Sequence, residues 1–318
     1  MMRRLLVVDL GGTAIKLGSW EAGRLTKMTP VTTPQNLEGY YQALIDAKKQ
    51  VESDAGPVEG VAISSPGAVD QSTGIIGGAS AIPYIHNFPI QQELEKGLGV
   101  PVTIENDANC AGLAECQFGA GRFGNSMLLL VIDSGIGGAV IFNNHIWHGA
   151  HLSGGEFGYM LAQHPADNGL TLSNMCSPVA MAKSFSAKKG REYSGKAVFD
   201  LAAAGEADAQ AAVNLLIGNL ASVIYNLQYS FDPDRIVLGG GVSRNPHLLP
   251  LLEAAEKKIR EKITANELKL SGVKFNLLRP KLAVSQFHAD GNLLGALVNY
   301  YQMRGLSGDE LNQIPEVR

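Results

Sequence analysis

Three glycine-rich segments in the sequence each follow a short apolar run. They are DLGGT at 9–13, DSGIGG at 133–138 and GGG at 239–241. Because glycine has no Cβ, successive backbone N–H groups in such segments can approach phosphate oxygens closely. One such segment alone is more often an ordinary turn, but three of them favour phosphate binding. The sequence contains neither a Walker A pattern nor a Rossmann GxGxxG pattern, so it favours a nucleotide held between two lobes.

Two of these segments begin with an aspartate, Asp9 in the first and Asp133 in the second. Either carboxylate could hold Mg²⁺, directly or through water, because this ion prefers carboxylate and phosphate oxygens. Each could instead cap the glycine turn that follows it. The residues alone do not choose between these two roles.

A further polar group, Glu105-Asn106-Asp107, lies between a short predicted strand and a predicted helix. An aspartate at such a junction often caps the helix. A sugar kinase, however, needs a carboxylate within hydrogen-bond reach of the attacking hydroxyl, with polar neighbours that orient the ring. Asp107 and Asn106 could supply both, which makes Asp107 the candidate catalytic base.

The elements that must position these residues alternate between strands and helices. Apolar runs predict strands at 3–9, 14–20, 58–64, 102–105, 127–133 and 235–238. Helical spacing of apolar residues predicts helices at 37–54, 91–98, 109–118, 208–231, 248–263 and 292–303. Such alternation predicts an α/β protein with mainly parallel or mixed sheets. The pattern of strand, aspartate and glycine turn recurs after 124 residues (133 − 9), which suggests two related lobes.

Length and composition restrict the possible classes of function. The 318 residues suit two lobes of about 100–200 residues each. A formal charge of −4 and the lack of a basic stripe argue against a nucleic-acid partner. No apolar run approaches the roughly 18 residues of a membrane span. Cys110, Cys116 and Cys176 show no CxxC spacing, which predicts reduced thiols and a cytoplasmic protein.

Six motifs together resemble those of the ROK sugar kinases, in order and in spacing, from residue 5 to about residue 245. They are DLGGT (9–13), SSPGAVD (64–70), ENDANC (105–110), DSGIGGAV (133–140), GGEFGYM (154–160) and LGGGV (238–242). The resemblance implies the actin/Hsp70/hexokinase superfold, with two ribonuclease-H-like α/β lobes around a central cleft. The expected lobes are 1–118 joined by a C-terminal helix at 290–304, and 119–289, with 305–318 as a tail. A homodimer is expected.

The resemblance also implies roles for individual residues. Asp107 matches the family's catalytic base, and Asn106 and Glu156 match ligands of the sugar hydroxyls. Four more residues are candidate substrate contacts: Ser65, Pro66, Gly67 and Tyr159. ATP and Mg²⁺ are the expected cofactors. The nucleotide is expected at Asp9, Gly11, Gly12, Thr13, Lys16, Ser134, Gly135, Gly137 and Gly138, with its adenosine side at Gly240 and Gly241.

The sequence departs from the family pattern near the sugar. Many members have a histidine after Glu-x-Gly and a cysteine cluster that binds zinc, but here Tyr159 takes the histidine position. The segment from Gln163 to Cys176 has a single cysteine, so no zinc site is expected, and His164 and Cys176 are interpreted as ordinary residues. The family's sugar-binding glutamate of the zinc motif aligns with Ser173.

GEFGYM together with ENDANC is similar to the β-glucoside kinase branch, which phosphorylates the 6-hydroxyl of the non-reducing glucose of cellobiose and related β-glucosides. Tyr159, with Tyr84 and His86 nearby in sequence, could stack on a second sugar or an aglycone. Alternatively, Tyr159 fills the volume of the lost zinc site and the protein is a glucokinase or another hexose kinase, acting on fructose or N-acetylmannosamine.

Two hypotheses lie outside sugar phosphorylation. One is a sugar-responsive ROK regulator without enzymatic activity, which would need a helix-turn-helix domain ahead of Asp9, where the sequence offers no room for it. The other is an acetate-kinase-like or chaperone ATPase on the same superfold, since a fold alone does not choose a function. The END and GEFG motifs favour a sugar.

Overall fold

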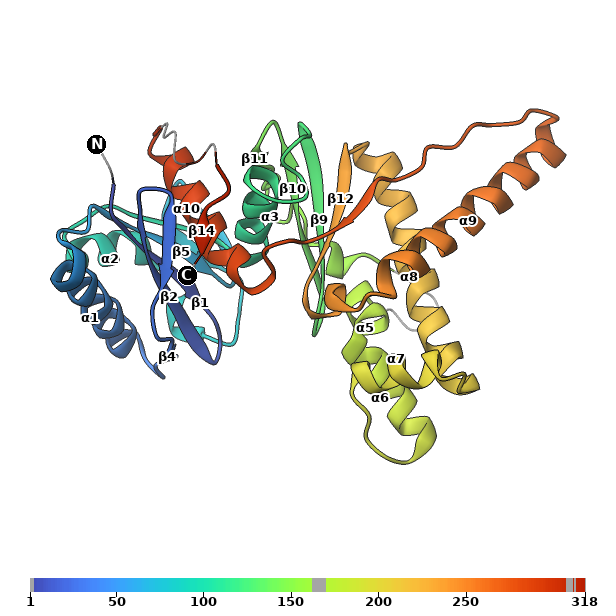
Figure 1. Ribbon diagram of the computed structural model, residues 1–318, viewed down its shortest axis with the longest axis horizontal. Helices are drawn as coiled ribbons and strands as arrows, with labels where there is room; N and C mark the ends of the chain where they lie inside the picture. Colours follow the sequence, from blue (N-terminus) through green and yellow to red (C-terminus); the bar gives the residue numbers. More distant parts are fainter. Residues whose placement is uncertain (1–2, 162–169, 307–310, 312, 318) are drawn as a thin grey trace. The chain divides into compact units, whose positions relative to one another are not determined.

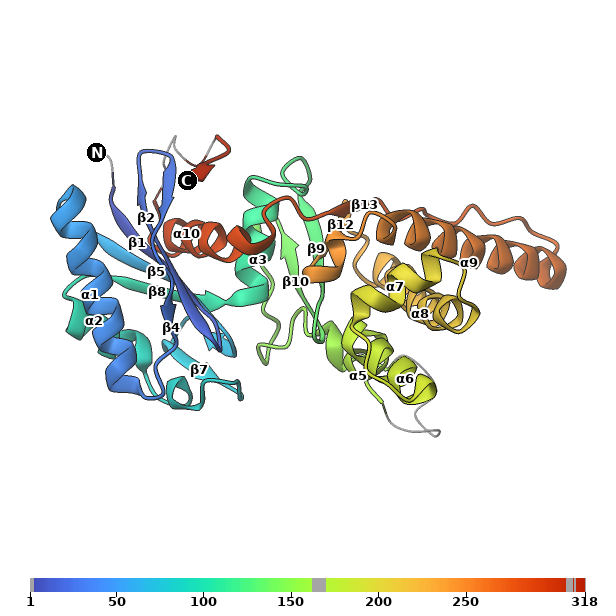
Figure 2. The ribbon, with the colours of Figure 1, turned by 60° about the horizontal axis from the view of Figure 1, so that its bottom comes forward.

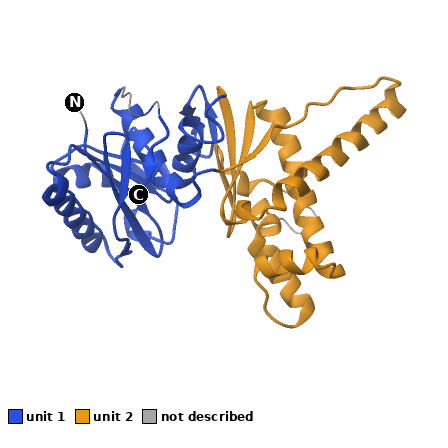
Figure 3. Cartoon of the chain, in the orientation of Figure 1, with its two compact units in different colours: residues 1–123, 140–154, 286–318 blue, residues 124–139, 155–285 orange. Residues whose placement is uncertain are grey.

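The computed structural model describes residues 3–161, 170–306, 311 and 313–317 (Figure 1). Contacts between residues divide the chain into two compact units, shown in Figure 3. Unit 1 comprises 1–123, 140–154 and 286–318, and unit 2 comprises 124–139 and 155–285. The boundaries expected from the sequence differ mainly in that they assign 140–154 to the other lobe, and also 119–123 and 286–289, and in that they set 305–318 apart as a tail.

Unit 1 contains a seven-stranded sheet in the order β14-β3-β2-β1-β5-β8, with β4 paired to β2. Strands β1, β5 and β8 run parallel, whereas β2 is antiparallel to both β1 and β3. The strands are β1 (Leu5–Leu10), β2 (Ala14–Glu21), β3 (Arg24–Lys27), β4 (Val31–Thr32), β5 (Gly60–Ser65), β8 (Val102–Asn106) and β14 (Glu316–Val317). Every residue of β1 and β5 is buried, as in a parallel sheet covered on both faces.

Side chains that alternate along β1 build a core on each face of this sheet. Leu6 and Val8 face α1 (Leu37–Ala55) and α2 (Ile90–Leu98). Leu5 and Val7 face α3 (Asp107–Gln117) and α10 (Gly291–Met303), which pack against each other (Figure 2). Shorter elements of unit 1 are the hairpin β6 (Ala68–Asp70) and β7 (Ile75–Gly77), η1 (Pro83–Ile85) and η4 (His288–Asp290).

A second sheet has the order β11-β10-β9-β12-β13, in which β9, β12 and β13 run parallel. Its strands are β9 (Ser126–Ile132), β10 (Ile136–Phe142), β11 (His145–Ile146), β12 (Arg235–Gly239) and β13 (Leu282–Val284), and the unit boundary falls within β10. The helices of unit 2 are η2 (Phe157–Tyr159), α5 (Leu172–Cys176), α6 (Pro178–Lys189), α7 (Gly195–Ala203), α8 (Ala207–Phe231), η3 (Gly241–Arg244) and α9 (Leu248–Ser271).

Helix α8 is long and apolar enough to cross a membrane by length and composition, the one such helix among the described residues. It packs against α7 and α9, and its apolar stripe, which includes Val213, Leu220 and Leu227, is buried. These contacts are those of a core helix. The three cysteines are buried free thiols.

The C-terminal residues do not form the expected tail. Val317 pairs with Leu25 in a parallel bridge between β14 and β3, and Arg24 forms an ion pair of 3.0 Å with Glu316. Leu306, Leu311 and Val317 pack against the unit 1 core. The prediction of a tail at 305–318 was therefore wrong for the residues that the structure describes.

Candidate active site

The parallel strands of unit 1 bring three motifs to one edge of the sheet. Asp9 pairs with Ser64 across β1 and β5, and Ser64 and Ser65 pair with Glu105 and Asn106 across β5 and β8. The carboxyl ends of adjacent parallel strands form the usual place for a ligand in an open α/β sheet. DLGGT, SSPG and END therefore meet at this edge, as the predicted site requires.

Asp9 lies buried at the end of β1, with its carboxylate held by three side chains. Its Oδ2 is 2.7 Å from the Lys16 Nζ, while its Oδ1 accepts hydrogen bonds from Ser64 Oγ (3.2 Å) and Asn292 Nδ2 (3.0 Å). The three donors come from β2, β5 and α10. The carboxylate thus joins neighbouring elements and does not cap the glycine turn, which was the alternative role.

The first glycine turn, between β1 and β2, is tightly closed at its base. The N–H of Gly11 donates to Ala14 O (3.1 Å), and Thr33 Oγ1 donates to Gly11 O (2.6 Å). A Cβ on Gly11 would lie 2.8 Å from Ala14 O, so a larger residue would disturb the turn. Gly12 and Thr13 are exposed at its tip, where their backbone can meet a phosphate.

At the end of β8, Asn106 caps α3 and Asp107 is the first residue of that helix. Asn106 Oδ1 accepts from Asn109 N (3.1 Å), and its Nδ2 donates to Gly67 O (3.1 Å). The cap expected as the ordinary role of Asp107 is thus made by its neighbour. The Asp107 carboxylate accepts from Ala108 N (2.8 Å) and lies at the carboxyl edge described above. Ser65 is fully buried, whereas Pro66 and Gly67 are half-buried.

In unit 2 the other two glycine segments are neighbours at the ends of the parallel strands β9 and β12. Gly240 has φ +81°, and a Cβ there would lie 2.3 Å from Ile132 O. A Cβ on Gly241 would lie 3.4 Å from Asp133 Oδ1, so this exposed carboxylate borders the third segment. Ser134, Gly135, Gly137 and Gly138 form the turn and the start of β10.

The GEFG motif packs on the backbone of β10. A Cβ on Gly155 would lie 2.7 Å from Gly138 O, and one on Gly158 would lie 2.1 Å from Ile136 O. Phe157 is buried between these glycines, which leaves the side chain of Glu156 pointing outward. Partial desolvation raises the pKa of Glu156.

Tyr159 does not fill a buried space, because 77% of its surface is exposed. The filling role proposed as an alternative is therefore wrong. Ser173 Oγ accepts from Ile136 N (3.0 Å), so this side chain ties α5 to β10 beside Gly158. Within unit 1, the Tyr84 hydroxyl donates to Pro34 O (2.6 Å) and the His86 Nε2 lies 2.8 Å from Ser80 Oγ, so both rings are fixed locally.

A cavity of about 630 Å³ lies in unit 2. It is bounded by α7, α8 and the start of α9, and its lining is mainly apolar, including Phe199, Val213, His247 and Leu251. Its size is in the range that accommodates small molecules and cofactors. It is the candidate site for the base of a nucleotide whose phosphates meet the glycine segments.

Asp9 and Asp133 could each supply one carboxylate ligand to Mg²⁺. Among the described residues, no group of three or more His, Cys, Asp or Glu side chains could hold a metal ion, and His164 lies outside the described residues. Mg²⁺ bound to nucleotide phosphates needs one or two protein carboxylates and keeps several waters. Asp133 can serve in that way, whereas Lys16 already occupies Oδ2 of Asp9, which favours a contact of Asp9 through water.

The ROK family model matches residues 5–280 of this chain. The chain belongs to the ROK family. Among its relatives, a β-glucoside kinase from Listeria innocua serovar 6a is 30% identical over 308 residues, which cover 94% of this chain and 98% of that protein. The expected family is thereby confirmed.

Solved structures of ROK proteins share the fold. A ROK family protein from Streptococcus pneumoniae TIGR4 in complex with sucrose has a TM-score of 0.84 and 36% identity, with 95% of this chain and 99% of that chain covered. A ROK glucokinase from Streptomyces griseus, in complex with glucose and AMPPNP, has a TM-score of 0.70 and 26% identity, with 92% and 97% covered. The α/β class and the actin/Hsp70/hexokinase superfold are confirmed.

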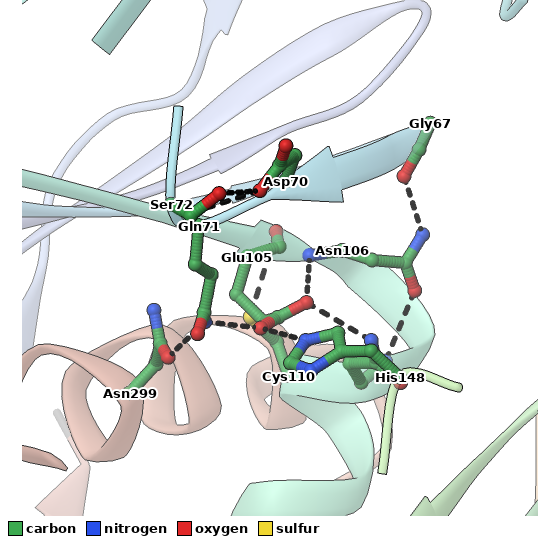
Figure 4. A network of polar contacts seen from close by, with 10 residues as sticks. Gly67, Asp70, Gln71, Ser72, Glu105, Asn106, Cys110, His148 and Asn299 are labelled. Carbon is green, nitrogen blue, oxygen red and sulfur yellow. Dashed lines mark hydrogen bonds and ion pairs between the residues drawn. The ribbon is translucent and has the colours of Figure 1, made fainter. Parts of the chain in front are cut away.

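The structure of this ROK protein adds site residues that the sequence did not reveal. Ser64 and Asn292 bind Asp9. Gln71 and His148 bind Glu105 (Figure 4). Ser64 could have been found from the sequence, because it directly precedes Ser65, a predicted substrate contact. Asn292 is 283 residues from Asp9, and no local pattern connects the two.

Proposed function

We propose that this ROK protein is a kinase that transfers the γ-phosphoryl group of ATP to the 6-hydroxyl of the non-reducing glucose of β-glucosides such as cellobiose. The observation that carries the proposal is the edge formed by β1, β5 and β8, where DLGGT, SSPG and END lie on adjacent parallel strands. A phosphate turn, a substrate loop and a carboxylate are the groups that such a transfer needs.

Asp107 acts as the general base. As the sugar oxygen attacks, a new O–P bond forms to the γ-phosphorus, the bond from that phosphorus to the bridging oxygen of ADP breaks, and the hydroxyl proton passes to the Asp107 carboxylate. Because phosphoryl transfer has a loose transition state, most of the rate comes from positioning and charge neutralisation. Asn106 orients the sugar with its second amide hydrogen, since the first is donated to Gly67.

The residues proposed to contact the phosphates of ATP are Gly11 to Thr13 with Lys16 in unit 1, and Ser134 to Gly138 in unit 2. Gly240 and Gly241 are proposed on the adenosine side of the nucleotide, and the 630 Å³ cavity of unit 2 is the candidate site for its base. Asp133 or, through water, Asp9 would hold Mg²⁺, which would supply positive charge to the phosphates.

Two features support a β-glucoside over free glucose. The exposed Tyr159 ring follows Glu156 by three residues and can stack on a second sugar or an aglycone. Ser173, which stands where many family members have a sugar-binding glutamate, is engaged with the backbone of Ile136 and offers no carboxylate. The relative from Listeria innocua bears the name β-glucoside kinase. We further propose a homodimer in the cytoplasm, where the three buried thiols stay reduced.

A coupled assay of ADP release tests this function over glucose, cellobiose, fructose, N-acetylmannosamine and a β-aryl glucoside. Cellobiose or the aryl glucoside should give a higher kcat/KM than glucose, and NMR of the product should place phosphate on the 6-position. Phosphorylation of glucose without activity on any β-glucoside would indicate a glucokinase. ATP hydrolysis unaffected by any sugar would instead indicate an ATPase of another class.

A further inference from the structure

The carboxylate of Glu105, two residues before the candidate base, is fully buried and surrounded by donors. Oε1 accepts from Asn106 N (2.7 Å) and Asn109 Nδ2 (2.9 Å). Oε2 accepts from the Nε2 of His148 (2.9 Å) and from the side-chain amide of Gln71, as Figure 4 shows. All four donors belong to unit 1.

A buried carboxylate is costly unless its charge is compensated. Of these four donors, only the imidazole of His148 can carry a positive charge. The hydrogen bond to Glu105 raises the pKa of His148 above its ordinary value of 6.5, against the opposing effect of desolvation, and the charge of Asp70 acts in the same direction. When it is protonated, the imidazole neutralises the charge of Glu105.

The same network fixes the turn from β8 into α3 from several sides. Gln71 donates a second hydrogen bond to Asn299 Oδ1 (2.8 Å) in α10. Asp70 Oδ1 accepts from Ser72 N (2.9 Å), which shapes the turn that carries Gln71. His148 contributes from the segment 140–154, so this segment, the turn after β6 and the start of α3 converge on one carboxylate, while Asn299 of α10 holds Gln71.

We propose that Glu105 and His148 are positioning residues, whose buried charged pair holds the β8–α3 turn so that Asn106 and Asp107 meet the sugar hydroxyl. The proposal rests on the sugar kinase function proposed above. When His148 loses its proton, Glu105 keeps only neutral donors, and the end of β8 can shift. A displacement of about 1 Å in a catalytic group can cost on the order of 10²-fold in rate.

The test is a pH profile of kcat and KM from neutral to alkaline pH, with a sugar that the wild type phosphorylates. In the wild type, kcat should fall as the pH rises through the elevated pKa of His148. His148→Gln keeps a donor at this position without a titrating group, so its kcat should be lower, by about 10- to 100-fold, and lack this alkaline fall. The KM for ATP should not change.

His151→Gln is the matched control, because His151 is an exposed histidine three residues further along the same segment. It should retain the wild-type kcat and its pH profile. Glu105→Gln should show a loss of kcat like that of His148→Gln, because the NH₂ group of the new glutamine side chain would face hydrogen-bond donors. If Glu105→Gln fails to fold, the result for His148→Gln tests the proposal alone, since the His148 side chain is 25% exposed and its replacement is tolerated more easily.

An unchanged kcat and alkaline fall in His148→Gln would overturn the positioning role, as would a lower Tm with normal kinetics, which indicates a merely structural pair. If the wild type phosphorylates sugars, these outcomes leave the proposed function intact. If it phosphorylates none, the function fails first, and the positioning proposal fails with it.

Discussion

Gly295 in α10 lies directly against the carbonyl oxygen of Cys110 in α3, and a Cβ on Gly295 would come within 1.7 Å of that oxygen. The obstacle is backbone, so the two helices would have to separate. Because α3 begins with Asp107, Gly295→Ala should lower both the Tm and kcat, with a stability loss of about 1–3 kcal/mol, as is usual for overpacking.

Gly218→Ala provides the matched control for this substitution. Gly218 also lies within a helix, α8, but no atom outside its own helix lies within 4 Å of a Cβ placed there. Alanine should therefore stabilise the protein by up to about 1 kcal/mol, the difference in helix propensity. Equal thermal unfolding curves for the two variants would show that α10 and α3 do not pack as described.

Asp107→Asn should reduce kcat by about 10²–10⁴-fold, the usual contribution of a general base. The Tm should stay close to that of the wild type, because the cap of α3 is made by Asn106. Asp54→Asn, an exposed aspartate of α1, serves as control and should leave kcat unchanged. Turnover near the wild-type rate in Asp107→Asn would rule out this residue as the base.

Glu156 should make sugar binding depend on pH on the acid side. Its pKa is raised by desolvation above its ordinary value of 4.5, so it takes up a proton earlier than an exposed glutamate as the pH falls. A carboxylate that accepts sugar hydroxyls loses acceptor capacity on protonation. The sugar KM should therefore rise as the pH falls through this pKa. Glu156→Gln should have a higher KM without that rise; the same acid rise in the variant would exclude Glu156 as its source.

Tyr159→Ala should lower kcat/KM for a β-aryl glucoside by about 2- to 10-fold, in keeping with one aromatic stacking contact. The value for glucose and the Tm should not change, because the ring is 77% exposed. Phe123→Ala removes another exposed aromatic ring, 82% exposed in unit 1, and should affect neither substrate. An equal loss for glucose and the aryl glucoside would contradict a role in aglycone binding.

The sequence predicted the elements whose signals are local. Strands β1 and β12 are continuous apolar runs, and the glycine turns follow them directly, so their positions needed no knowledge of the rest of the fold. Helices α6 and α7 were missed. A local signal was present for α6, since Ser177 caps it and Pro178 is its first residue, a common start of a helix.

Contacts between distant segments could not be predicted in this way. Whether Asn292 meets Asp9, or His148 meets Glu105, depends on how α10 and the segment 140–154 pack, which no periodicity encodes. The short strand β14 is two residues long, too short to show an alternating pattern. The identity of the candidate base was accessible from the sequence, whereas the groups that hold it in place were not.

The division of unit 1 into three separate chain segments has a consequence for biosynthesis. The first 123 residues leave the ribosome well before α10 and β14 are made, yet both elements complete the core and the edge of the same sheet. Until α10 has been synthesised, the face of β1 that it covers stays open to water and to chaperones. Unit 1, whose first segment is synthesised before unit 2, is thus completed after it. Chains truncated before residue 286 should therefore be prone to aggregation.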